Sequence, residues 1–103
     1  MTKDELIATA KLRIRKSTTD DLDKDVGQLV AVAITDLKRI GVHDDYLDEE
    51  NISDPLIIEA ACLYAKANFG SPEDHTELMA AYHMILTKIK GGGYNRSTSD
   101  ADN

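Results

Sequence analysis

The chain has 103 residues and a formal net charge of −7 at pH 7, with 42% hydrophobic and 30% charged residues. This length fits one domain and excludes an enzyme built from a cofactor domain and a substrate domain, while the composition excludes wholesale disorder. The acidic balance repels DNA and anionic membranes, so it disfavours a free monomer that reads DNA sequence.

The residue types indicate how the core is built and where the chain is made. Aromatic residues are only 5% of the chain and tryptophan is absent, so the core must consist of aliphatic residues, which suits helices. The one cysteine, Cys62, cannot form an intramolecular disulfide, which fits a reducing compartment. The N-terminal residues lack a signal-peptide pattern, and no apolar run is long enough to span a membrane. We therefore expect a soluble protein that is cytoplasmic when made and does not enter a membrane.

Two helices are predicted in the first part of the chain. Thr2 and Glu5 have the spacing of a capping box, and the apolar stripe after them predicts a helix over about residues 2–15. Apolar residues at spacings of three and four predict a second helix over about residues 19–40, which Gly41 ends.

Residues 42–53 form an acidic connector that is long for a compact helical domain. Its apolar residues, which can pin it to the body, are Val42, Tyr46, Leu47 and Ile52. Residues 1–16 hold five Lys or Arg, whereas residues 42–54 hold six acids and no Lys or Arg. These segments are either two solvated surfaces or complementary patches that join subunits head to tail. The candidate contact residues are Arg13, Arg15, Lys16, Asp44, Asp45, Tyr46, Asp48 and Glu49.

The third predicted helix is the most strongly marked one in the chain. Asp54 is a good N-cap, Pro55 fits the first helical position, and Gly70 marks the end. Only Glu59 and Lys66 are charged between these ends, so we expect burial on most sides, in a core or at a subunit interface.

A fourth helix is predicted to follow at once, because Ser71 and Asp74 have the spacing of a second capping box, with Pro72 at the first helical position. It ends at Lys90, before three glycines. Residues 91–103 are rich in Ser, Asp and Asn and have no periodicity, which predicts a flexible tail.

These elements predict an all-α fold: a compact bundle of about four helices, with a long acidic loop between helices two and three and a flexible C-terminal tail. The helical domain is predicted over residues 1–90 and the tail over residues 91–103. The predicted core residues are Leu29, Ile34, Leu37, Ile57, Ala61, Tyr64, Phe69, Tyr82 and Ile85.

No constellation typical of catalysis, cofactor binding or metal binding stands out. His43, His75 and His83 lack the spacing of a zinc motif, and residues 44–50 lack the alternate acids and turn glycine of a calcium loop. Cys62 lies in an apolar helix, where a buried and inert thiol is expected. We therefore expect a protein that is not an enzyme and needs no cofactor or metal.

The basic segment 11–16 raises the question of nucleic-acid binding. It has no interleaved aromatic residues and no recognition helix after it, so a solvated or subunit-facing basic end is the favoured interpretation. A small helical regulatory or DNA-binding protein remains the alternative.

Residues 54–70, with the sequence DPLIIEAACLYAKANFG, resemble the characteristic helix of the phage head–tail connector (adaptor) family. The likeness extends to residues 6–14, to residues 20–42 and to Tyr82, so it covers about residues 4–90. The third-helix motif is the specific part of this resemblance.

The resemblance implies a structural virion protein of a tailed phage or prophage. Such a subunit forms a ring, expected to have twelve-fold symmetry, below the portal protein and receives the tail or stopper protein, although it can be monomeric in isolation. DNA is then only passing cargo, and an acidic ring lets the duplex slide without gripping it. The protein is expected at the head–tail interface of the virion, after assembly in the host cytoplasm.

Overall fold

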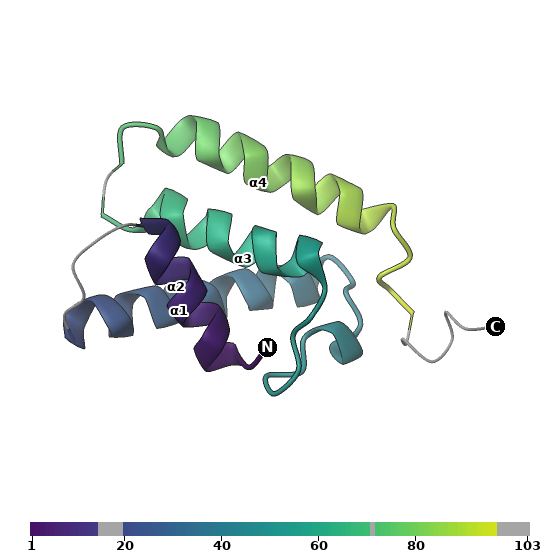
Figure 1. Ribbon diagram of the computed structural model, residues 1–103. Helices are drawn as coiled ribbons and strands as arrows, with labels where there is room; N and C mark the ends of the chain where they lie inside the picture. The colour runs from purple at the N-terminus through teal and green to yellow at the C-terminus, as the bar shows by residue number, and fades with distance from the viewer. Residues whose placement is uncertain (15–19, 71, 97–103) are drawn as a thin grey trace.

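The computed structural model describes residues 1–14, 20–70 and 72–96 (Figure 1). These residues form four α-helices and one short 3-10 helix and contain no β-strand. In chain order the elements are α1 (Lys3–Ile14), α2 (Asp20–Arg39), η1 (Asp44–Tyr46), α3 (Pro55–Asn68) and α4 (His75–Lys90). The predicted all-α class is therefore confirmed.

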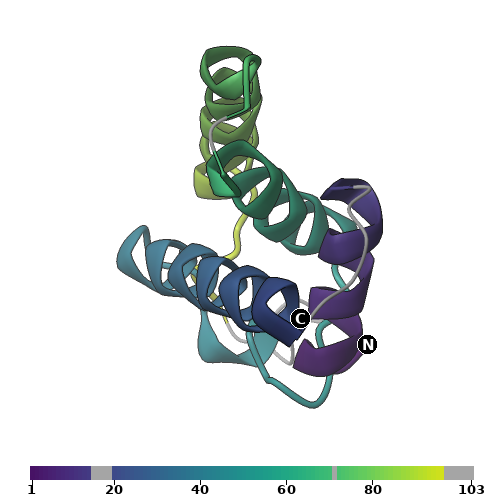
Figure 2. The same cartoon turned by 90° about the vertical axis from the view of Figure 1, so that its left-hand side faces the viewer.

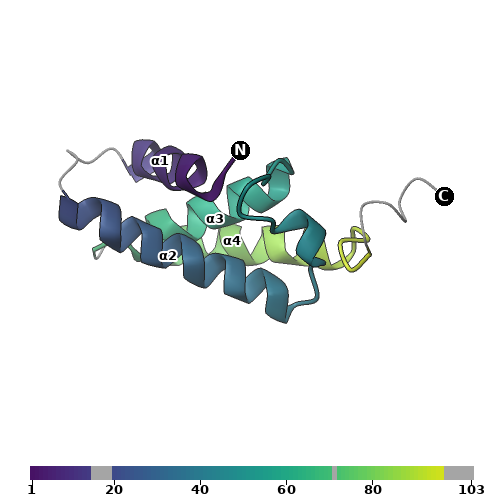
Figure 3. The same ribbon diagram turned by 90° about the horizontal axis from the view of Figure 1, so that it is seen from below.

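Helix α3 is the centre of the bundle, because it contacts each of the other three α-helices. Figure 2 shows α4 on one side of α3, with α1 and α2 on the other. Helix α1 also packs against α2, and in Figure 3 it lies beside the first half of that longer helix. In the part of the chain that the structure describes, no helix has the length and apolarity needed to cross a membrane.

Local capping explains where three of the helices begin or end. Thr2 and Glu5 exchange two hydrogen bonds: the Thr2 amide donates to the Glu5 carboxylate at 2.9 Å, and the Glu5 amide donates to the Thr2 hydroxyl at 3.1 Å. Asp54 accepts hydrogen bonds from two amides in the first turn of α3. Gly41 and Gly70 follow α2 and α3 with φ of +100° and +68°, a backbone conformation that favours glycine.

The start of α4 differs from the prediction. The helix begins at His75, and Asp74 is its N-cap without a side-chain hydrogen bond. The His75 amide donates to the Pro72 carbonyl at 3.2 Å, so residues 72–75 form a turn before the helix. Asp74 therefore does not serve as the third helical residue of a capping box, and Ser71, the other member of that pair, lies outside the described residues.

The predicted core is present, although part of it lies at the edge of the packed interior. The predicted core residues that are buried are Ile34, Leu37, Ile57, Ala61 and Tyr82. The predicted core residues that are only partly buried, and pack against that core, are Leu29, Tyr64, Phe69 and Ile85. A helical face of apolar residues has flanks as well as a centre, and the periodicity that predicts the face does not separate the two.

Candidate functional site

The acidic connector is an exposed row of carboxylates held on a buried apolar base. Its buried residues are Val42, Leu47 and Ile52. Its exposed acids are Asp44, Asp45, Asp48, Glu49 and Glu50. The apolar anchoring that the sequence predicts is therefore confirmed, and it presents the negative charge of this segment, the acidic loop, to the outside.

Short turns inside the acidic loop fix its backbone. The Asp45 amide donates to His43 Nδ1 at 3.0 Å, and the Glu50 amide donates to Asp48 Oδ1 at 3.0 Å.

A surface cavity of about 490 Å³ lies between the loop and the end of α2. It is lined by Lys38, Asp44, Asp45, Leu47, Asp48 and Asn51. Among the described residues, no group of three or more His, Cys, Asp or Glu side chains could hold a metal ion. The loop suits contact with a cationic protein surface.

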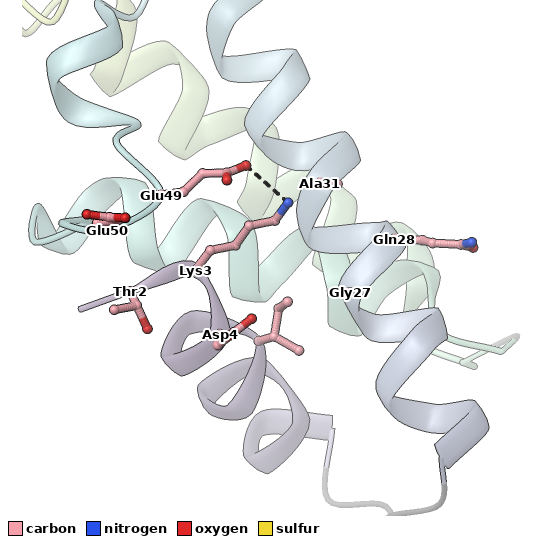
Figure 4. Close-up of a pocket in the computed structure, with 9 residues that line it drawn as sticks. Thr2, Lys3, Asp4, Gly27, Gln28, Ala31, Glu49 and Glu50 are labelled. Atoms are coloured by element: carbon pink, nitrogen blue, oxygen red, sulfur yellow. Dashed lines mark hydrogen bonds and ion pairs between the residues drawn. The ribbon is translucent and has the colours of Figure 1, made fainter.

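The first residues of the chain brace the acidic loop from one side. The Ile52 amide donates to the Met1 carbonyl, and the Lys3 amide donates to the Glu49 carbonyl, both at 2.6 Å. Lys3 Nζ also forms an ion pair with Glu49 Oε1 at 3.3 Å, which Figure 4 shows beside a cavity of about 670 Å³ between α1, α2 and the loop. The start of α1 and the acidic loop are thus joined within one subunit.

Tyr94 braces the acidic loop from the other side, beyond the predicted domain end at residue 90. Its hydroxyl donates to both carboxylate oxygens of Asp54 at 2.9 Å, and its carbonyl accepts a hydrogen bond from the His43 amide at 2.7 Å. Its ring packs on Tyr46, with 4.8 Å between the centroids. The packed body therefore extends at least to Tyr94, and residues 97–103 of the predicted tail lie outside the described residues.

Gly92, two residues before Tyr94, is required by this return of the chain. A Cβ atom at Gly92 would lie 2.9 Å from Tyr94 Cε2 and 3.1 Å from the Lys88 carbonyl oxygen. We expect Gly92→Ala to displace the Tyr94 ring and to lower the free energy of unfolding by about 1–3 kcal/mol, as overpacking does. Urea unfolding followed by circular dichroism measures this change.

Gly91→Ala is the matched control for this prediction. A Cβ at Gly91 would meet nothing closer than 3.9 Å, and its φ is −89°, which any residue adopts. We expect this variant to be as stable as the wild type. Equal loss of stability in both variants would contradict a specific role for the Gly92–Tyr94 contact.

The Tyr94 hydroxyl also makes the fold sensitive to alkali. Burial, followed by the hydrogen bond to Asp54, raises the pKa of Tyr94 from 10.0 to about 12. Because the folded state holds this proton more tightly, the resulting stability is fully present below pH 10 and is lost as pH rises to about 12. We expect Tyr94→Phe to remove this part of the pH dependence. Unfolding curves measured across that range test this, and an unchanged pH profile in the variant would contradict it.

Arg13, near the end of α1, pairs with α3 and not with the acidic loop of the same subunit. It forms a two-pronged ion pair with Glu59 on α3, with N–O distances of 2.7 and 3.1 Å. This hydrogen bonding lowers the pKa of the Glu59 carboxyl and raises the pKa of Arg13. Arg15 and Lys16, the other predicted basic contacts, lie outside the described residues.

The other potentially reactive side chains, those of Cys62 and His75, are part of the packing between helices. Cys62 is 1% exposed, and burial raises the pKa of its thiol, which disfavours the reactive thiolate. His75 Nδ1 lies 2.6 Å from the Ala67 carbonyl oxygen, so this side chain ties the start of α4 to the end of α3. These observations fit the buried and inert thiol that the sequence predicts for Cys62.

Sequence reasoning missed two members of this site. Tyr94 lies in a segment whose composition predicts flexibility, and its only signal is an aromatic residue directly after three glycines. Lys3 is one of several cations in the sequence, and its partner Glu49 is 46 residues away in the chain.

Comparisons of this chain with family models, with curated proteins and with solved structures found no match.

Proposed function

We propose that this chain is a structural virion protein of a tailed phage or prophage, a head–tail connector subunit. In this proposal, copies of the chain form a ring below the portal and join the DNA-filled head to the tail or stopper protein. The observation that carries the proposal is that the motif of residues 54–70, which resembles the connector family, forms the central helix of the bundle. The proposal assigns the chain no catalytic role.

Several residues of this motif have defined packing roles, which supports reading the motif as a unit. Asp54 caps α3 and accepts a hydrogen bond from the Tyr94 hydroxyl. The Tyr64 ring packs on the Tyr82 ring of α4, with 5.2 Å between centroids, and Asn68 Nδ2 donates to the Tyr64 carbonyl at 2.9 Å. Because these residues set the helix packing, the resemblance supports a shared fold. We propose the function from that shared fold.

The charge distribution suits a subunit that surrounds DNA without holding it. The chain has a net charge of −7, and the acidic loop adds an exposed row of carboxylates. Negative charge weakens phosphate binding, so a duplex would pass through such a ring with little retention. The loop, fixed on both sides, is the surface that we assign to a basic region of the portal, the tail protein or a neighbouring subunit.

The test combines portal binding with electron microscopy. We expect the purified chain to bind the portal protein of the same phage or prophage and to appear there as a ring in negative-stain images. Asp44→Lys with Asp48→Lys should weaken this binding, because both acids are exposed on the loop. Glu73→Lys with Glu77→Lys is the matched control, since these exposed acids lie near the start of α4 and change the net charge equally.

Failure of the wild-type chain to bind the portal and to form rings under any condition would overturn the proposal. Sequence-specific DNA binding without portal binding would instead support the alternative, a small helical regulatory or DNA-binding protein. Genes for portal, capsid and tail proteins beside this gene would favour the connector before any protein is made.

A further inference from the structure

Leu12 is a large apolar side chain that the subunit leaves in solvent. It is 78% exposed, more than any other large hydrophobic residue in the described part of the chain. Leu6 and Ala10 face the body from α1, and at about 100° per residue Leu12 lies on the opposite side of that helix. One exposed leucine is ordinary on a protein surface, so its meaning depends on a matching recess elsewhere.

Such a recess lies between α2 and the end of α3. This groove has a volume of about 420 Å³ and an apolar lining of Leu29, Val32 and Phe69. Its polar lining is Asp25, Gln28 and Asn68. Val32 is 44% exposed, although it is a large hydrophobic residue, so the groove is an incompletely covered apolar surface.

Leu12 and the groove lie on opposite flanks of the molecule. Gly27 and Ala31 line the cavity that α2 shares with α1, and a Cβ at Gly27 would lie 3.6 Å from Ile7 Cδ1. At about 100° per residue, Leu29 and Val32 lie on the other flank of α2, away from α1. Figure 2 shows α1 on one side of α2. On the opposite side of α2, in the region below α4, no α-helix lies beside it. Since Leu12 is exposed, a subunit does not fill its own groove with it.

We propose that the groove lined by Leu29, Val32 and Phe69 binds Leu12 of a second copy of this chain. The charges around the two patches are complementary. Leu12 stands between Lys11 and Arg13 in the sequence, whereas Asp25 is exposed and lines the groove. Because the contact joins two different patches, each copy keeps one free patch of each kind, and repetition closes into a ring or continues as a filament.

This inference deepens the proposed function, on which it rests only for the biological purpose of the ring. The first test is the oligomeric state of the wild-type chain, measured by sedimentation velocity and light scattering up to millimolar concentration. We expect reversible association that Leu12→Gln or Val32→Lys weakens by about tenfold to a hundredfold, the effect of losing one buried aliphatic side chain. Met84→Gln, on α4 and 65% exposed, is the matched control and should associate like the wild type.

Mixing the two variants tests the head-to-tail pairing itself. Leu12→Gln keeps an intact groove and Val32→Lys keeps an intact Leu12, so the mixture should form one-to-one dimers and nothing larger. A mixture that stays monomeric, a Leu12→Gln variant that associates like the wild type, or a wild type that is monomeric at millimolar concentration would each overturn this contact. Portal binding by a monomeric wild type would leave the connector proposal standing, so the two failures are distinguishable.

Discussion

Replacing Ile57 with alanine is expected to lower the free energy of unfolding by about 2–5 kcal/mol, because it opens a cavity in the centre of the bundle. Ile57 is 0% exposed and lies in the first turns of α3, the helix that contacts all three others. Domains of this size are stable by only about 5–15 kcal/mol, so this single change removes a large share of the total. Because the chain has no tryptophan, urea unfolding is best followed through the helical circular dichroism signal.

Ile58→Ala is the control for this prediction. Ile58 is the same residue type, one position further along the same helix, but it is only partly buried and packs against the edge of the core. Since the loss scales with the apolar area and the cavity volume, we expect a clearly smaller effect. Equal losses at both positions would contradict the deeper burial of Ile57, on which this prediction rests.

Sequence reasoning predicted those parts of the fold that are encoded locally. The capping pair of Thr2 and Glu5, the N-cap Asp54 and the glycines after α2 and α3 all act within a few residues of themselves. Their signals are therefore complete in the sequence. For the same reason, helices α1 to α3 begin and end within a residue or two of the predicted positions.

The start of α4 shows where local reasoning fails. The spacing of Ser71 and Asp74 is that of a capping box, yet the helix begins only at His75. His75 contacts the Ala67 carbonyl of the preceding helix, so a contact with a residue eight positions earlier helps to fix the start of α4. A spacing rule contains no term for that contact.

The candidate site was less predictable than the fold, because its geometry depends on pairs far apart in sequence. The charge pattern predicted an exposed acidic segment, which the structure has, but it did not specify a partner for Arg13. That partner is Glu59, 46 residues away, on a helix that the sequence marks by its few charged residues. The predicted pairing of the basic end of α1 with the acidic loop of a neighbouring subunit stays a prediction, now with Arg13 already engaged inside its own subunit.

Asp54 is where the loop, α3 and the C-terminal segment meet, and Asp54→Ala is expected to lower the free energy of unfolding by about 2–5 kcal/mol. The variant loses an N-cap, worth about 0.5–2 kcal/mol, and a hydrogen bond from Tyr94 to a charged acceptor, worth about 1.5–3 kcal/mol. Asp54→Asn keeps a capping oxygen and should lose less. The capping bonds are at 2.9 and 3.3 Å, to the Leu56 and Ile57 amides.

A double-mutant cycle with Tyr94→Phe separates the two contributions. If the Tyr94 hydroxyl acts through Asp54, the double variant should be more stable than the sum of the single losses predicts, by about 0.5–3 kcal/mol, as for residues in direct contact. Strict additivity would mean that the bond contributes nothing, and that the ring contact with Tyr46 and the hydrogen bond from the His43 amide hold the segment. Hydrogen exchange at the His43 amide, which donates to the Tyr94 carbonyl, gives an independent reading of whether the segment stays in place. Faster exchange there in both Asp54→Ala and Tyr94→Phe would mean that one carboxylate fixes the acidic loop and the end of the packed body together.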